Sequence, residues 1–295
     1  MRGGTYLVKG QHTQEALDGE HIVPYESLSR RVPALRDEFA GADPYPHVVL
    51  ENFLPADVIE RMLAEFPAVR SGEWIHYVHF NERKFGQTDR ELFGPTIRAV
   101  VEELNSPRFL GLLRDITGID DLLPDETLEG GGLHQSERGG FLNVHADFTV
   151  HPHRRDWRRR LNLLLYLNPV WDESYGGYLE LWDTEMRACR KKIGPLLNRC
   201  VIFSTDPTSF HGHPDPMTCP PDVTRKSLAL YYFTQDDAAM VRSTEYRARP
   251  GEGVRGLGIY LDKMMLRAYD RTKRALGIDD RFASGLLKLL SGRRK

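Results

Sequence analysis

A series of short strand-like segments between residues 130 and 235 constrains the fold of this 295-residue chain more than any other feature. Most of these segments are rich in apolar and aromatic residues, and glycine, asparagine, aspartate or proline separates each from the next. The segments are 133–136, 141–147, 160–168, 178–182, 198–204 and 225–234. Many short strands with turn-rich gaps are typical of a double-sheet jelly roll, because such strands close into two facing layers.

Helical patterns flank the strands on both sides. Before the series, apolar residues recur at helical spacing, and after it two apolar clusters can each cover a face or an edge of the sheet. Residues 47–53 have the composition of a strand that precedes the second helical pattern. The helical patterns and clusters are Leu28 to Phe39 (interrupted by Pro33), 58–66, 97–104, 109–116, 264–266 and 286–290.

These patterns together predict an α+β fold. Its core would be a double-stranded β-helix, or jelly roll, at 130–235. An N-terminal helical support region at 1–129 and a C-terminal helical extension at 236–295 would pack on it as one compact domain. Residues 137–140, Glu-Arg-Gly-Gly, have the chemistry of a hairpin turn, so we expect the segments on either side to pair.

Composition excludes several classes of protein. The chain is 40% hydrophobic and 28% charged with a formal net charge of -2, so its charge gives no case for nucleic-acid binding. Its 3 cysteines form neither a paired framework nor a CxxC motif, which fits a reducing compartment, and we expect a cytoplasmic protein. We find no signal-like N-terminus and no apolar run long enough to span a membrane, and no feature specifies an oligomeric state.

The end of segment 141–147 carries the first candidate site residues. Side chains two positions apart on a strand point to the same face, so His145 and Asp147 lie together. One more histidine would complete a 2-His-1-carboxylate facial triad, which suits non-heme Fe(II) and leaves coordination positions open. A later strand of the same barrel should supply it, and both His211 and His213 follow segment 198–204.

Arg225 is the second unusual feature, because it opens an apolar strand that ends in aromatic residues. Arginine is rarely buried unless it is paired. A guanidinium held inside an apolar barrel is well placed to bind a carboxylate through two parallel hydrogen bonds.

The ordered set His145-x-Asp147, His211 and Arg225 resembles the Fe(II)/2-oxoglutarate-dependent dioxygenases, and within them the prolyl-4-hydroxylase-like branch. The resemblance covers roughly residues 130 to 235. Segments 166–168, 171–172 and 176–181 match that branch in residue type and order, and 52–55 is similar to the helical entry of bacterial members.

The resemblance implies a role for each matching residue. His145, Asp147 and His211 would hold iron, and His211 is chosen over His213 by the order of the family motif. Arg225 would pair with the distal carboxylate of 2-oxoglutarate. Further cofactor contacts are expected from Ser227, Tyr166, Asn162 and Gln135.

The implied reaction is hydroxylation of an unactivated C–H bond in a small-molecule or peptidyl substrate. O2 and 2-oxoglutarate are consumed, and succinate and CO2 are released. Related halogenases have alanine or glycine where hydroxylases have the carboxylate, so Asp147 favours hydroxylation over chlorination, while desaturation and cyclisation stay open. The alternative from another class is a non-catalytic jelly-roll protein that binds, for example, carbohydrate.

The stretch 151–160 is strongly basic. We interpret it as a solvated loop. The functional alternative is that it binds an anionic group of the substrate at the mouth of the barrel.

Overall fold

The computed structural model describes residues 22–71 and 73–276. Four helices precede the core and a fifth follows it: α1 (Tyr25–Gly41), α2 (Ala56–Glu65), α3 (Pro95–Leu104), α4 (Pro107–Thr117) and α5 (Gly253–Leu276). The strands are β1 (His47–Leu50), β2 (Ile75–His79), β3 (Glu82–Gln87), β4 (Leu123–Pro124), β5 (Gly132–Ser136), β6 (Phe141–Ala146), β7 (Trp157–Tyr166), β8 (Leu179–Trp182), β9 (Cys189–Ile193), β10 (Arg199–Ser204), β11 (His211–His213), β12 (Arg225–Gln235) and β13 (Glu245–Tyr246). The described residues also form three single-turn 3-10 helices: η1 (Val69–Ser71), η2 (Arg90–Leu92) and η3 (Glu173–Tyr175).

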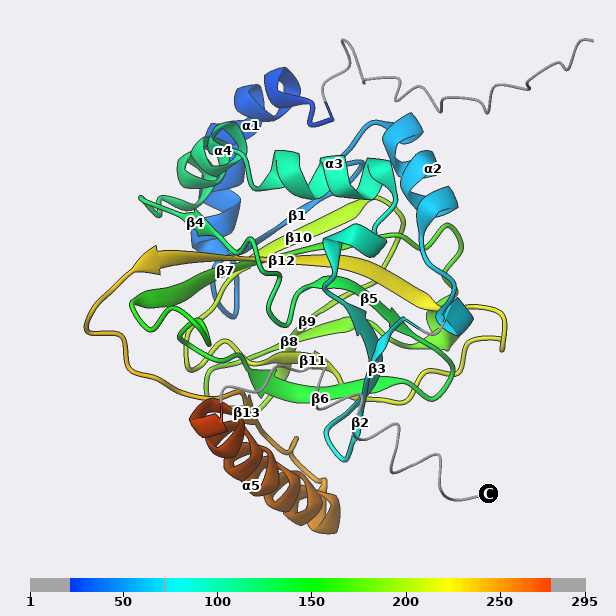
Figure 1. Ribbon diagram of the computed structural model, residues 1–295, viewed down its shortest axis with the longest axis vertical. Helices are drawn as coiled ribbons and strands as arrows, with labels where there is room; N and C mark the ends of the chain where they lie inside the picture. The colour runs from blue at the N-terminus through cyan, green and yellow to red at the C-terminus, as the bar shows by residue number, and fades with distance from the viewer. Residues whose placement is uncertain (1–21, 72, 277–295) are drawn as a thin grey trace, which may run out of the picture.

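Within the described residues these strands form one 13-stranded antiparallel sheet, in the order β1-β10-β7-β12-β5-β3-β6-β11-β8-β9. β2 pairs with β3, β4 with β12 and β13 with β6. The sheet curls into two layers, with β7, β10 and β12 in one and β6, β8 and β11 in the other (Figure 1). The predicted α+β jelly roll is confirmed.

Alternation along β7 separates the helix-covered face of the sheet from its interior. Leu161, Leu163 and Leu165 are fully buried in the core that also contains the apolar faces of the N-terminal helices. The intervening residues Asn162 and Tyr166 therefore point to the opposite face, between the two layers. Helices α1 to α4 lie above the first layer (Figure 1) and cover its outer face. The inward-pointing side chains of β7 therefore lie between the two layers of the sheet.

The helical patterns before the core correspond to α1, α2, α3 and α4. Pro33 lies within α1 and does not end it. A proline removes one backbone hydrogen bond, and here the carbonyl that loses its donor belongs to the exposed Ser29. Water can satisfy this carbonyl, which explains why the helix tolerates the proline.

The first part of the chain is more than a helical layer. β1 pairs with β10, and β3 lies between β5 and β6. The sheet thus includes strands that precede residue 130. Sequence patterns missed β3 because polar residues dominate it, and they missed β2 because its residue types, Ile-His-Tyr-Val-His, do not alternate between apolar and polar.

β5 and β6 do not form the expected hairpin. Phe85 of β3 lies opposite Gln135 of β5, and Arg83 lies opposite Phe141 of β6. Both ladders are antiparallel, so β5 and β6 run in the same direction, and residues 137–140 loop out between them. Turn residues indicate where a strand ends, but they do not reveal that β3, which is distant in the sequence, lies between β5 and β6 and pairs with both. The chain thereby passes from the layer of β12 to the layer of β11.

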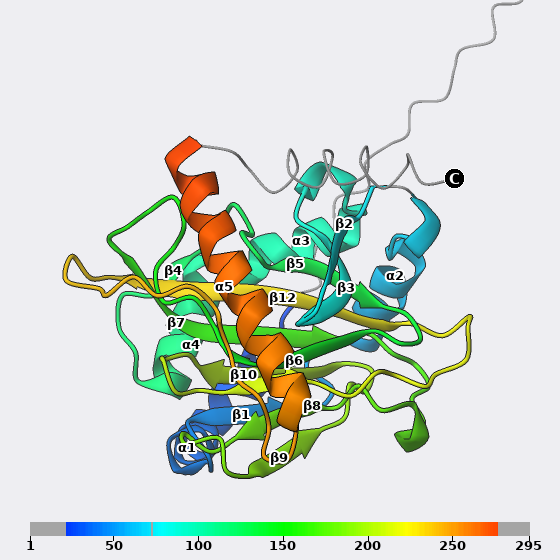
Figure 2. The ribbon, with the colours of Figure 1, turned by 90° about the horizontal axis from the view of Figure 1, so that it is seen from below.

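Helix α5 packs on the lower layer beside β13 (Figures 1 and 2), through the buried Ile259 and through polar side chains. Asp262 accepts hydrogen bonds from His79 and Asn81, and Arg255 donates to Asn143. Met264 and Met265 are exposed, so the expectation that they cover the sheet is wrong for these two residues. Apolar clustering does not reveal which face of a helix docks when polar pairs make the contact.

The apolar cluster expected at 286–290 lies outside the described residues. None of the helices in the described part of the chain combines the length and the apolar composition needed to cross a membrane.

Candidate active site

Pairing between β6 and β11 brings two histidines together. His211 lies directly opposite His145 in the antiparallel ladder, and their ring centroids are 4.5 Å apart. Asp147 immediately follows the last residue of β6, two positions from His145. The alternation that predicted a shared face for His145 and Asp147 therefore holds in the structure.

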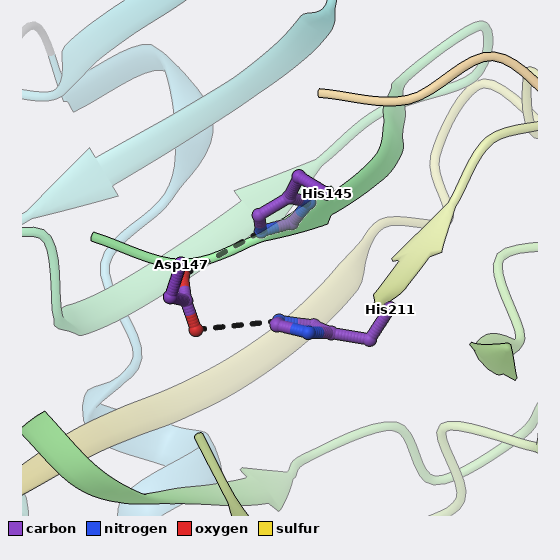
Figure 3. A group of neighbouring side chains, drawn as sticks. All are labelled: His145, Asp147 and His211. Atoms are coloured by element: carbon purple, nitrogen blue, oxygen red, sulfur yellow. Dashed lines mark ion pairs between the residues drawn. The ribbon is translucent and has the colours of Figure 1, made fainter. Parts of the chain in front are cut away.

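The three side chains converge on one point (Figure 3). Nε2 of His145 lies 3.6 Å from Oδ1 of Asp147, and Nε2 of His211 lies 3.5 Å from Oδ2. One ligand atom from each residue lies within 4.8 Å of the others. Two imidazoles and one carboxylate around one point form a facial triad, the donor set that suits non-heme Fe(II).

Backbone hydrogen bonds fix the histidine tautomers. Nδ1 of His145 donates to the carbonyl oxygen of Asn143 at 2.9 Å, and Nδ1 of His211 donates to that of Ser209 at 3.0 Å. The proton on Nδ1 leaves the Nε2 lone pair of each ring facing Asp147. A ligating histidine is held in this way by a partner on its other ring nitrogen.

Burial and charge set the protonation states that a divalent metal requires. Burial lowers the pKa of His211 to about 4, although Asp147 opposes this effect. Burial alone would raise the pKa of Asp147, but the charge of Arg159 and the two histidines hold it well below the usual range. At neutral pH His211 is therefore neutral and Asp147 ionised, as metal ligation requires.

His213 is buried but lies outside the triad. The ladder between β11 and β6 shifts register between His211 and His213, so that His213 lies opposite Leu142. Among the described residues, the group that could hold a metal contains His145, Asp147 and His211 and omits His213. Burial holds the pKa of His213 well below its usual value, and the charges of Arg225 and Lys84 lower it further.

Arg225 is the first residue of β12 and is buried. Its Nε donates to the carbonyl oxygen of Gly177 at 2.8 Å, and Nη2 donates to the hydroxyl of Tyr166 at 3.2 Å. Gly177 has a φ of 68°, and a Cβ there would lie 3.2 Å from Cδ of Arg225, so glycine suits this close approach. No carboxylate of the described residues pairs with Arg225, and a buried guanidinium without one is suited to an anionic ligand.

Tyr166 and Ser227 accompany Arg225. Ser227 lies opposite Tyr166 in the ladder between β12 and β7, so both share the inward face with Arg225, two residues before Ser227. These three residues fit a dicarboxylate such as 2-oxoglutarate, because they offer one cation and two hydroxyl groups.

The structure places Asn162 and Gln135 differently from the other expected residues. Asn162 lies on the inward face and donates to Oδ2 of Asp147 at 2.8 Å, so its contact is with the triad. Gln135 lies opposite Lys226, the neighbour of Arg225, and so on the other face of β12. The expected contact of Gln135 with the cofactor is therefore not formed. His134 takes the inward position instead, opposite Ser227.

The basic stretch 151–160 is only partly a solvated loop. His151 and Arg159 are both buried, which corrects the expectation for these two residues. His151 contacts Asp125 at 3.3 Å, and Arg159 contacts Asp147 at 3.0 Å. Sequence reasoning missed Arg159 because its neighbours Arg158 and Arg160 belong to the same charged run.

Comparison with known proteins agrees with this geometry. Residues 131–233 match the family model of the 2OG-Fe(II) oxygenase superfamily, and this range includes the triad and Arg225. This stretch of the chain is therefore similar to the 2OG-Fe(II) oxygenase superfamily, whose members use Fe(II) and 2-oxoglutarate. The resemblance inferred from the sequence motifs is thereby confirmed.

Its relatives in sequence and in structure include prolyl hydroxylases. The prolyl 3-hydroxylase OGFOD1 of Mus musculus is 29% identical over 194 residues, which cover 63% of this chain and 33% of that protein. The chain thus spans about a third of the length of this curated relative.

Two solved structures share the fold. A prolyl hydroxylase from Trichoplax adhaerens, in complex with a peptide fragment of the hypoxia inducible factor oxygen degradation domain, is 20% identical with a TM-score of 0.51, covering 71% of this chain and 91% of its own. A prolyl 4-hydroxylase from Phytophthora capsici is 18% identical with a TM-score of 0.50, and the match covers 88% of this chain and 79% of that one.

Proposed function

We propose that this protein is an Fe(II)- and 2-oxoglutarate-dependent dioxygenase that hydroxylates an unactivated C–H bond of a prolyl residue in a peptide or protein. The observation that carries the proposal is the buried triad of His145, Asp147 and His211 in the same interior as the buried Arg225. The identity to a mouse prolyl 3-hydroxylase supports a peptidyl prolyl substrate.

When bound, iron would supply the redox chemistry by which O2 and 2-oxoglutarate are converted to succinate and CO2 and one oxygen atom enters the substrate. The protein supplies orientation. His145, Asp147 and His211 would hold the metal from one side, which leaves the other positions for 2-oxoglutarate and O2. Arg225 would pair with the distal carboxylate of 2-oxoglutarate, with Tyr166 and Ser227 beside it.

Asp147 favours hydroxylation as the outcome. Its carboxylate occupies the position that a chloride ion would need, and its negative charge disfavours a halide nearby. The inner faces of β7 and β12 add apolar and aromatic side chains, including Leu164, Ala229 and Phe233, which exclude water from the interior.

The product experiment uses proline-containing peptides, with free proline as a second arm, in chloride buffer under ¹⁸O2. We expect mass spectrometry to find one labelled oxygen atom in a hydroxylated peptide and one in succinate, with little product from free proline. His211→Ala removes a metal ligand without opening the position of Asp147, so it is the matched control and should give neither product. A chlorinated main product, or a hydroxylated product without label, would contradict the proposal.

A further inference from the structure

A second buried cation lies against the triad itself. The side chain of Arg159 is 1% exposed, and its Nη2 lies 3.0 Å from Oδ2 of Asp147. Its guanidinium stacks over the ring of Tyr231 at 3.5 Å and lies 4.5 Å from the ring centre of Phe148. The two aromatic rings hold the guanidinium in one place.

Asn162 forms a hydrogen-bonded triangle with Arg159 and Asp147. Nε and Nη2 of Arg159 donate to Oδ1 of Asn162 at 2.9 and 2.6 Å. The Asn162 amide in turn donates to Oδ2 of Asp147 at 2.8 Å. Oδ2 of Asp147 therefore faces two protein donors as well as Nε2 of His211 at 3.5 Å, while Oδ1 faces the ring of His145 and accepts from neither Arg159 nor Asn162.

A β-bulge creates this triangle. Tyr232 lies opposite Leu161 and Phe233 lies opposite Arg159, so Arg160 is an extra residue in the ladder between β12 and β7. Residues three apart on a regular strand point to opposite faces, but the bulge brings Arg159 onto the same face as Asn162. The irregularity thus aims an arginine at the triad.

We infer that Arg159 and Asn162 are positioning residues that fix the rotation of the Asp147 carboxylate, so that Oδ1 is the oxygen presented to the metal. A carboxylate can ligate through one oxygen or through both. Two donors on Oδ2 hold Asp147 to the first mode, which keeps a further coordination position open. This inference rests on the proposed iron site and adds the residues that orient one of its ligands.

Charge alone predicts the opposite effect on metal affinity. A guanidinium near a divalent ion repels it, so removal of Arg159 would tighten metal binding if the residue acted only through its charge. Asn162 is neutral, so Asn162→Leu removes a hydrogen bond to Asp147 without changing the net charge. The two variants together separate orientation from Coulombic repulsion.

The experiment measures Co(II) binding to the metal-free protein by calorimetry, and the visible absorption of the Co(II) form. We expect Asn162→Leu and Arg159→Met each to weaken binding by roughly 10- to 100-fold, the usual effect of losing a partner of a metal ligand. Because Arg159 and Asn162 act as one unit, the double variant should lose about as much Co(II) affinity as the single variant that binds Co(II) less tightly. The Co(II) spectrum of both should change, and Arg159→Lys should recover part of the affinity.

Arg158→Met is the matched control, since Arg158 is partly exposed and pairs with Asp236. It should bind Co(II) as the unmodified protein does. The KM for 2-oxoglutarate should change little in Asn162→Leu, because Arg225 is untouched. Equal or tighter Co(II) binding by both triangle variants, with an unchanged spectrum, would overturn this inference alone. An unmodified protein that binds no Co(II) would overturn the proposed function as well.

Discussion

Replacing His211 with alanine is expected to abolish tight binding of a divalent metal, whereas His213→Ala should keep most of it. His211 contributes its Nε2 to a set of ligand atoms within 4.8 Å of one another, and His213 is not part of that set. Loss of a ligand should exceed the roughly 10- to 100-fold effect of losing a ligand's hydrogen-bond partner. Calorimetric titration of the metal-free variants with Mn(II) measures the difference.

Thermal unfolding of both variants provides the control for this pair. Each removes one buried imidazole from the same short strand, so the two substitutions should have comparable effects on packing. If His213→Ala lost the metal while His211→Ala retained it, the choice between the two histidines would be wrong.

The second large effect is expected at Arg225. Arg225→Ala should raise the KM for 2-oxoglutarate by roughly 10²- to 10⁴-fold, because leaving a buried charge without its partner costs about 3–5 kcal/mol. Metal affinity should stay near that of the unmodified protein, since Arg225 does not contact the triad residues. The KM of Arg225→Lys for 2-oxoglutarate should lie between those of the unmodified protein and Arg225→Ala, because lysine keeps the charge and loses the paired hydrogen bonds.

Lys226→Ala is a matched control for this substitution. Lys226 is the next residue of β12 and its side chain lies on the other face, where it donates to Thr224. It should leave the 2-oxoglutarate dependence unchanged. An Arg225→Ala variant with an unaltered KM for 2-oxoglutarate would contradict the proposed anchor.

Local patterns were sufficient wherever one strand or helix determines the outcome. Alternation along one strand placed His145 and Asp147 on a common face, and helical spacing located α2, α3 and α4. Arg225 was identified because a charge at the head of an apolar strand needs a partner. For His211, strand geometry left His213 as an alternative, and only the order of the family motif separated them.

Long-range pairing explains what the sequence did not reveal. Gln135 was expected to contact the cofactor, but the register between β5 and β12 places His134 on the inner face instead. Arg159 reaches Asp147 only because a bulge in β7 changes the alternation at Arg160. A register between strands far apart in the chain, or a single extra residue in one of them, leaves no local trace in residue type.

Anaerobic addition of Fe(II) and then 2-oxoglutarate, followed by visible absorption, tests the central claim most directly. We predict a metal-to-ligand band that appears only when both are present, with saturation at one equivalent of each. His211→Ala should show no band, and Arg225→Ala should need far more 2-oxoglutarate to develop one. A folded protein that binds neither Fe(II) nor 2-oxoglutarate, and so gives no band, would contradict the account and favour a non-catalytic jelly-roll binding protein.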